Sequence, residues 1–395
     1  MKDAPSPPRA TLPSLPFGVY VHVPYCRRRC PYCDFYFEVR KADRSFAEAL
    51  HVELCARSND RPGEVPRTLY FGGGTPTALP DDALAAAVTA VADVVGLAPD
   101  AEVTVEANPE DLGPGRCRAL AALGVNRLSL GVQSFEDDVL RYLGRAHKGA
   151  EAEDTVKRAL DEGIARVSVD LIAGVPGERP GRLEREVERL VRLGVGHVSA
   201  YLLTVEAGTP LEGLIQLGRR GPLVDDLQAD AYEALQELLP AAGFRQYEVS
   251  SFSRPGEESR HNRLYWAKGT WLGLGPGAHS MRLVDDGRVE RRHTTARLEA
   301  WLDDPAGAAH EREVLSPGEA FHEAVAFGLR DLVAGVRLED LAARHGVEVP
   351  AALRGVLAAA AERRLVACSD GAICLTALGA RFADAVARDV LTASG

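Results

Sequence analysis

Three cysteines lie close together near the start of the chain, at Cys26, Cys30 and Cys33, in the segment CRRRCPYC. Their C-x3-C-x2-C spacing places three thiols on one short loop. Three thiolates can hold three irons of a cubane iron–sulfur cluster, whereas ordinary electron-transfer clusters take four cysteines. The fourth iron then keeps an open position for a substrate or cosubstrate, as catalytic zinc sites do. We therefore predict a [4Fe–4S] cluster on this loop.

A structural zinc site is the alternative interpretation of these cysteines. His22 or His51 would have to supply the fourth ligand, because no second closely spaced cysteine pair exists. Disulfides are not expected, since the N-terminal residues lack the apolar core of an export signal. The remaining cysteines are isolated and are expected to be small core residues: Cys55, Cys117, Cys368 and Cys374.

Further polar residues follow the predicted strands where those strands end. The glycine-rich turn Gly72-Gly73-Gly74-Thr75-Pro76 lets the backbone approach a ligand closely, which suits a zwitterionic amino-acid head. No lysine follows it, so it is not a Walker phosphate loop. Glu106, Gln133 and Asp170 end or follow successive strands, and Arg145 comes in the loop after Gln133. The carboxyl ends of barrel strands meet at one face, so we expect these side chains to converge on one ligand.

Tyr20 and His22 share one face of the first predicted strand, opposite a row of valines. The period of two along a strand produces this alternation. We expect both side chains to point toward the barrel interior, where His22 is most simply explained as a hydrogen-bonded core residue.

Strands and helices alternate between residues 17 and 245. Short β-branched runs followed by helical patterns are typical of βαβ units and a parallel sheet. Six such units are too few for a closed eightfold barrel. The predicted fold is therefore α/β, a partial (β/α)6 TIM-like barrel, with expected strands at 18–23, 68–71, 102–106, 127–130, 166–170 and 197–203 and helices from Ser45, from Asp81 and over 229–239.

The chain changes character after residue 245. Residues 246–316 are predicted to be a connecting segment. Residues 317–395 are predicted to form three short helices, a hairpin at Ser369-Asp370-Gly371 and a final helix, the order of a winged-helix domain. The proline-rich residues 1–16 are predicted to be a disordered lead-in.

The 395 residues carry a formal net charge of -11, which argues against nucleic-acid binding. The most apolar stretch, residues 83–92, is far shorter than the ~20 residues that span a bilayer. We expect a cytoplasmic protein without direct membrane insertion. Any attachment to a membrane is expected to go through a protein partner, since an acidic surface is not attracted to anionic lipid.

The cysteine triplet, with Phe35 two residues after it, resembles the radical S-adenosylmethionine superfamily. Within it the chain resembles the branch of oxygen-independent coproporphyrinogen III oxidases, in the stretches YVHVPYCRRRCPYCDF, YFGGGTPT, VEANPE, LSLGVQSF, LGRAHK and DLIAGVPGE. In that superfamily S-adenosylmethionine chelates the open iron and is cleaved to a 5'-deoxyadenosyl radical. The resemblance implies that the cosubstrate is contacted by Tyr20, Gly73, Gly74, Thr75, Glu106, Gln133, Arg145 and Asp170, and by the backbone of Phe35.

Two departures separate the chain from the oxidases. Phe35 stands where they carry a further cysteine, and only about sixteen residues precede the first strand. The segment HNRLYW at residues 261–266 is instead similar to the H-N-x-x-Y-W signature of the HemW family of heme chaperones. His261 would offer an axial ligand to heme iron, and Tyr265 and Trp266 a flat contact for the macrocycle. A packed, hydrogen-bonded histidine is the alternative.

The resemblance thus implies a heme chaperone that binds a [4Fe–4S] cluster, S-adenosylmethionine and heme. Its partners would be an acceptor hemoprotein, for example a respiratory one, and an electron donor for the cluster. The alternative is a radical enzyme that oxidises coproporphyrinogen III or performs related chemistry. The same cofactors serve both functions, so the sequence leaves enzymatic activity open, as it does the formation of a homodimer.

Overall fold

The computed structural model describes residues 16–60, 63–284, 286–308 and 310–393. The predicted lead-in at residues 1–16 lies almost wholly outside the described residues.

One twisted sheet organises the barrel, and six of its strands run parallel in chain order. These strands are β1 (Phe17–Val23), β4 (Thr68–Gly73), β5 (Glu102–Ala107), β6 (Arg127–Gln133), β7 (Arg166–Ala173) and β8 (His197–Leu202). Apolar side chains such as Val19 and Val21 are fully buried against the surrounding helices. The predicted partial (β/α)6 barrel is confirmed.

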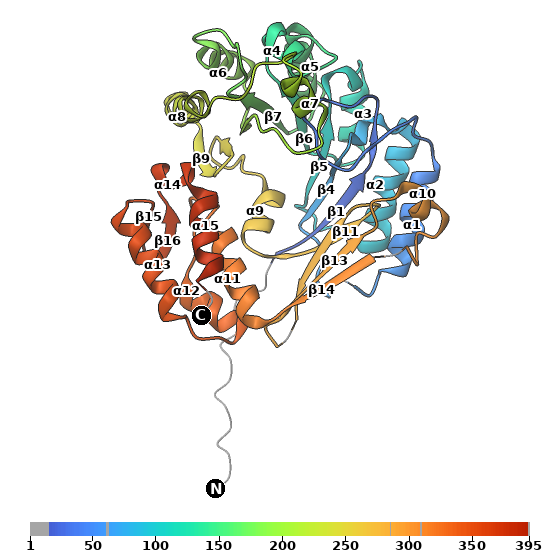
Figure 1. Ribbon diagram of the computed structural model, residues 1–395. Helices are drawn as coiled ribbons and strands as arrows, with labels where there is room; N and C mark the ends of the chain where they lie inside the picture. The colour runs from blue at the N-terminus through green and yellow to red at the C-terminus, as the bar shows by residue number, and fades with distance from the viewer. Residues whose placement is uncertain (1–15, 61–62, 285, 309, 394–395) are drawn as a thin grey trace.

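Helices cover the outer face of the sheet (Figure 1). In α2, Ala83, Leu84, Ala87 and Val91 are buried at helical spacing, while acidic residues occupy the first turn. The barrel helices are α1 (Ser45–Ala56), α2 (Asp81–Val95), α3 (Arg116–Ala122), α4 (Asp137–Tyr142), α5 (Gly149–Asp161), α6 (Arg182–Leu193), α7 (Pro210–Gln216) and α8 (Asp225–Ala241).

The barrel does not close between β8 and β1, because other strands occupy both edges. β10 (Ser251–Ser253) pairs with β8 and with β9 (Arg245–Glu248). On the other side β11 (Thr270–Leu274) runs parallel to β1 and continues into β12 (His279–Leu283), β13 (Val289–Thr294) and β14 (His310–Leu315). This segment also contains α9 (Arg260–Trp266) and α10 (Leu298–Asp303).

Residues 246–316 therefore do more than connect two parts of the chain. β11 was not predicted from the sequence, because glycines interrupt its apolar pattern. Gly273 is required there, since a Cβ would lie 2.0 Å from the carbonyl oxygen of His279 on the neighbouring strand.

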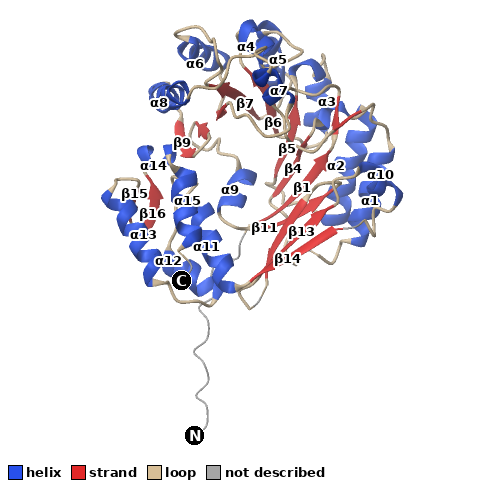
Figure 2. Ribbon diagram, viewed as in Figure 1, coloured by secondary structure: helices blue, strands red, loops and turns tan. Residues whose placement is uncertain are grey.

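The C-terminal module follows the sheet and consists mainly of helices with one short hairpin (Figure 2). It has its own apolar core. It contains α11 (Pro317–Gly328), α12 (Leu338–His345), α13 (Ala351–Glu362), β15 (Val366–Ser369), β16 (Ala372–Leu375), α14 (Ala377–Arg381) and α15 (Ala383–Thr392). Ser316 and Glu319 form a capping box that starts α11. The predicted hairpin turns at Asp370 and Gly371, which both have positive φ, as a type I′ turn requires.

Within the described part of the chain, no helix combines the length and apolarity needed to cross a bilayer.

Candidate functional site

The cysteine loop is held against the end of β4 by backbone hydrogen bonds. The loop begins at β2 (Tyr25–Cys26), which pairs with β3 (Glu38–Val39). The amides of Gly74 and Thr75 donate to the carbonyls of Val23 and Tyr25 at 2.9 and 2.7 Å. The Cys26 Sγ lies 3.5 Å from the Thr75 hydroxyl. The two predicted motifs, thiols and glycines, are therefore one structural unit.

Arg145 places a positive charge beside the thiols. Its guanidinium donates to the Cys30 Sγ at 3.3 Å and to the carbonyl oxygen of Gly131 at 2.8 Å, and it also contacts the Asn108 side chain. Burial alone would lower the pKa of Arg145. The electrostatic effects of Tyr32, Cys30 and Glu110 are larger together, and they raise the pKa above its usual value. Arg145 therefore places a permanent positive charge at the edge of the cysteine loop.

Burial raises the pKa of the Cys26 thiol to about 11. Cys33 is shifted in the same direction for the same reason. Such thiols keep their protons until a metal displaces them, so cluster assembly releases protons here.

Gly73 at the end of β4 and Gly74 just after it form a glycine cradle beside the cysteine loop. A Cβ on Gly73 would lie 2.4 Å from the His22 ring, and its φ of +106° is one that residues with side chains rarely adopt. A Cβ on Gly74 would lie 2.8 Å from the Tyr25 carbonyl oxygen. Glycine is therefore required at both positions, at Gly73 beside the His22 ring of β1 and at Gly74 beside the backbone that leads into the cysteine loop.

We expect Gly74→Ala to weaken binding of S-adenosylmethionine about tenfold, or about 1.4 kcal/mol. The added methyl would push the turn off the backbone of the cysteine loop. Equilibrium binding to reconstituted protein measures this. Gly113→Ala is the matched control, because nothing lies within 4 Å of its Cβ position. Equal affinity of both variants would contradict the role of the cradle.

Two carboxylates lie deep in the same region. Glu106 accepts hydrogen bonds from the Tyr70 hydroxyl at 2.7 Å and from the Gly73 amide at 3.1 Å. Asp170 accepts from the Ser129 hydroxyl at 3.3 Å. Burial, reinforced by the charge of Glu106, raises the pKa of Asp170 to about 7. Both groups are thus arranged to accept hydrogen bonds from a cationic or hydroxyl-bearing ligand.

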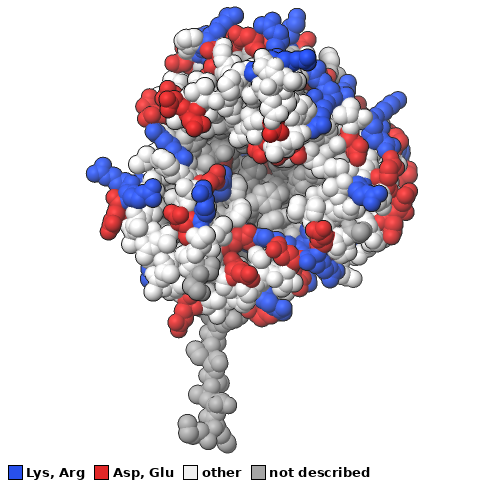
Figure 3. All heavy atoms as spheres, viewed as in Figure 1, with Lys and Arg blue, Asp and Glu red and all other residues white. Residues whose placement is uncertain are grey.

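These side chains line one cavity of about 1110 Å³. The surface is hollowed between the C-terminal module and the barrel in Figure 3, with mostly uncharged atoms in the hollow and charges of both signs around it. Eleven of the predicted site residues line the cavity: Cys26, Cys30, Cys33, Phe35, Gly73, Gly74, Thr75, Glu106, Gln133, Arg145 and Asp170.

Tyr20 and His261 are the predicted site residues that do not line the cavity. Tyr20 lies on the inner face of β1, where its hydroxyl is 3.1 Å from His22 Nδ1 and its ring stacks on Tyr70. His22 Nε2 is 3.0 Å from the Tyr36 carbonyl, which agrees with its interpretation as a core residue.

His261 is buried, with 1% of its surface exposed. Its Nδ1 lies 2.8 Å from the Thr68 hydroxyl and its Nε2 lies 2.8 Å from the Tyr265 hydroxyl. Its ring stacks on Tyr70, and burial lowers its pKa to about 3. Both ring nitrogens are therefore engaged, and an iron could be bound only after one of these contacts breaks. The geometry favours the packed alternative for this histidine.

We expect His261→Ala to lower the free energy of unfolding by about 2–4 kcal/mol. It would leave a cavity and remove partners from the buried hydroxyls of Thr68 and Tyr265. Urea denaturation measures the loss. The exposed His51 gives the control His51→Ala, and equal midpoints for the two variants would contradict a structural role for His261.

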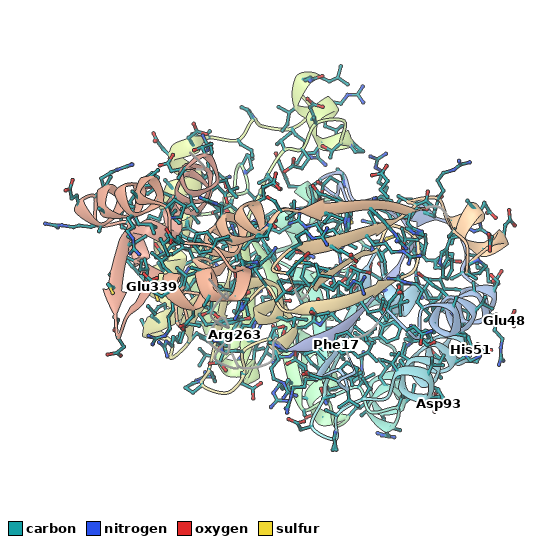
Figure 4. All side chains as sticks on the ribbon, turned by 90° about the horizontal axis from the view of Figure 1, so that it is seen from below. Phe17, Glu48, His51, Asp93, Arg263 and Glu339 are labelled. Atoms are coloured by element: carbon teal, nitrogen blue, oxygen red, sulfur yellow. The ribbon has the colours of Figure 1, made fainter. Side chains whose placement is uncertain are left out.

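No three histidine, cysteine or acidic side chains among the described residues gather around a point where one metal ion would sit. His51, the other ligand considered for zinc, lies on α1 beside Glu48 (Figure 4). Its ring nitrogen is 3.7 Å from the Sγ of Cys55, on the exposed face of that helix. Neither His22 nor His51 lines the cavity with the three thiols.

Several contributors to the site were not predicted from the sequence. Asn108, within the VEANPE stretch, donates to Thr75 at 3.1 Å and contacts Arg145. Asn108 comes two residues after Glu106, so its position in the sequence could have indicated that it lies at the same end of the strand. By contrast, nothing in the sequence indicated the part of the cavity wall formed by α8 and the C-terminal module: Gln228, Tyr232, Arg330, Leu378, Arg381 and Phe382.

The fold and the site together define a radical S-adenosylmethionine protein. The model of the Radical SAM superfamily matches residues 20–190, and that of the HemN C-terminal domain matches residues 315–382. The solved structure of Escherichia coli coproporphyrinogen III oxidase HemN, described as a radical SAM enzyme, superposes with a TM-score of 0.81. It covers 97% of this chain and 92% of its own at 22% identity, which shows a shared fold.

Curated relatives define the family more narrowly. "Heme chaperone HemW" of Mycobacterium tuberculosis (strain H37Rv) is 45% identical over 280 residues, 69% of this chain and 71% of the relative. "Heme chaperone HemW" of Bacillus subtilis (strain 168) is 34% identical over 369 residues, which are 92% of this chain and 96% of the relative. The chain belongs to the HemW family. Membership of the radical SAM superfamily implies a [4Fe–4S] cluster and S-adenosylmethionine.

Proposed function

We propose that this protein is a heme chaperone that binds a [4Fe–4S] cluster, S-adenosylmethionine and heme and delivers the heme to an acceptor hemoprotein. The observation that carries the proposal is the convergence of the three thiols, the glycine cradle and the buried carboxylates on one cavity. Relatives named as heme chaperones support the choice of cargo.

The residues present fit the cluster and its cosubstrate. The loop supplies three soft sulfur donors, and Arg145 stands beside one of them. One nitrogen of Arg145, the Nε, is buried and has no hydrogen-bond partner among the described residues, so it can receive an anionic group of a ligand. When bound, the cluster supplies an electron and an iron with an open position.

The side chains of the cavity have distinct roles in this proposal. Cys26, Cys30 and Cys33 hold the cluster. The cradle and Arg145 hold the amino-acid head of S-adenosylmethionine, and Glu106 and Asp170 accept hydrogen bonds from the rest of it. Because the cavity is enclosed by the C-terminal module, water is partly excluded from the bound cosubstrate.

We propose further that the protein works in the cytoplasm with an electron donor for its cluster. The heme would be received by an acceptor hemoprotein, such as a respiratory one. Any contact with a membrane would then be made through that acceptor.

A transfer assay tests the function. Reconstituted protein loaded with heme is mixed anaerobically with an apo-hemoprotein, and the absorbance of the acceptor follows delivery. We expect transfer that depends on the cluster, without consumption of coproporphyrinogen. Equal transfer by cluster-free protein would contradict the coupling of cluster to delivery. Formation of protoporphyrinogen and 5'-deoxyadenosine from coproporphyrinogen III would instead establish the oxidase alternative.

A further inference from the structure

The cavity is larger than the cluster and its cosubstrate explain. Its volume of about 1110 Å³ exceeds the ~300–1,000 Å³ of most small-molecule sites. The residues assigned above come from the cysteine loop and the ends of β4 to β7. The opposite wall, formed by β8, α8, the turn between β9 and β10, and the C-terminal module, has no role in that assignment: Tyr201, Tyr232, Val249, Arg330, Leu378 and Phe382.

Tyr201 is the most unusual residue of this wall. It lies on β8 opposite Ile172 of β7, both of which line the cavity, while its neighbour Ala200 is buried. Yet 44% of the Tyr201 side chain is exposed. Burial, with the charges of Asp170 and Glu248, raises its pKa well above the ordinary value. Its hydroxyl is hydrogen-bonded to the Ser199 side chain, and Tyr201 is accessible through the cavity.

The charges around Tyr201 favour a cation. Asp170 and Glu248, which make a lone phenolate costly, would stabilise a positive centre bound to that oxygen. Ferric iron is such a centre, and tyrosine is a known axial ligand of heme iron. In that bond the phenol gives its proton to water as its oxygen binds iron, and the iron keeps its oxidation state.

The C-terminal module supplies the flat apolar contact that a macrocycle needs. Leu378 of α14 and Phe382, which precedes α15, line the cavity with 41% and 46% of their side chains exposed. Apolar side chains exposed together on a concave surface mark a binding site for a ligand with apolar faces.

Two arginines line the same wall and suit the carboxylates of such a ligand. Arg330 pairs with Asp384 at 3.1 Å, and Arg381 pairs with Glu233 at 3.0 Å. The Asp384 side chain is 91% exposed and that of Glu233 is 50% exposed, so both ion pairs are weak. The carboxylates of a ligand can therefore replace Asp384 and Glu233 as partners of the two arginines. The Arg330 Nε has no hydrogen-bond partner among the described residues.

We propose that heme binds in this outer part of the cavity, with the Tyr201 oxygen as its axial ligand, its ring against Leu378 and Phe382, and its propionates at Arg330 and Arg381. This rests on the proposed function, since it takes heme as the cargo. It replaces His261, whose two nitrogens are engaged, as the residue that binds iron.

The test compares Tyr201→Phe with the wild type in titrations of the reconstituted protein with hemin. We expect the variant to bind hemin at least about tenfold more weakly and to lose the phenolate-to-iron charge-transfer band. Metal-free protoporphyrin IX should bind both proteins equally, because the ring contacts remain. Tyr232→Phe is the matched control: its hydroxyl also lies at the cavity wall but donates to the Val249 carbonyl at 2.7 Å.

The outcomes separate this inference from the function on which it rests. If the wild type binds no hemin, the proposed function fails. If the wild type binds hemin and Tyr201→Phe keeps both the affinity and the spectrum, the function stands and the assignment of Tyr201 is overturned. Loss of hemin binding in Tyr232→Phe but not in Tyr201→Phe would overturn it as well.

Discussion

Replacing Cys26, Cys30 or Cys33 by alanine is expected to abolish the iron–sulfur cluster. With two thiolates left, a second iron of the cubane loses its protein ligand and becomes accessible to water and oxygen through the cavity. Iron content should fall from about four per chain to near zero, and the brown colour of anaerobically purified protein should disappear. The heme-transfer activity that depends on the cluster should be lost with it.

Two other cysteines provide the controls for these variants. Cys117 is fully buried in the apolar core, as expected. Cys55 on α1 and Cys368 on β15 are exposed, so the prediction of a core position is wrong for both of them. Cys117→Ala should cost about 1 kcal/mol of stability, the ordinary size for a point change, and leave iron content unchanged. Cluster absorbance retained in any variant of the triplet would show that the ligands are misassigned.

Arg127→Met is expected to lower the free energy of unfolding by about 3–5 kcal/mol, because it leaves the charge of Glu102 buried and uncompensated. The two side chains form an ion pair at 3.0 Å and are each 1% exposed. Arg127 also donates to Ser168 and to the carbonyls of Glu257 and Glu258, just before α9. Urea denaturation followed by circular dichroism measures the loss.

The double variant Glu102→Leu with Arg127→Met separates a broken pair from lost packing. Removing both charges should recover much of the lost stability, since the uncompensated carboxylate is gone. Arg260 and Asp100 form an exposed pair at 3.2 Å, so Asp100→Ala should shift the midpoint little. The urea midpoints of both variants are compared with that of the wild type. If Arg127→Met shifts the midpoint as little as Asp100→Ala does, the buried pair does not stabilise the fold.

The barrel was predictable because its strands are short, β-branched and separated by helices of the right period. The strands that extend the sheet beyond the barrel were not predictable. The strands of residues 270–315 carry glycine and charge, as in Gly273 and the run Glu311–Glu313, and an edge strand that faces solvent lacks the apolar pattern of a buried one. The turn Asp370-Gly371 was predictable since these residues readily adopt positive φ.

The candidate site was predictable where a motif ends a strand. Glu106 and Asp170 end the predicted strands 102–106 and 166–170 and therefore reach the same edge of the sheet, although the observed β7 continues to Ala173. His261 shows the limit of this reasoning: the motif identified an important residue, but only the structure shows that Thr68 and Tyr265 occupy both nitrogens. Phe382 and Leu378 could not be predicted, because they reach the cavity through the packing of the C-terminal module against the barrel.

The central claim is that three cysteines hold a cluster whose remaining iron binds S-adenosylmethionine. Electron paramagnetic resonance of the reconstituted, reduced protein tests it most directly, recorded with and without that cosubstrate. The account predicts a [4Fe–4S]⁺ signal whose g values change when S-adenosylmethionine is added, and no signal in Cys30→Ala. A colourless protein that contains one zinc ion per chain, or a cluster signal that S-adenosylmethionine leaves unchanged, would contradict it.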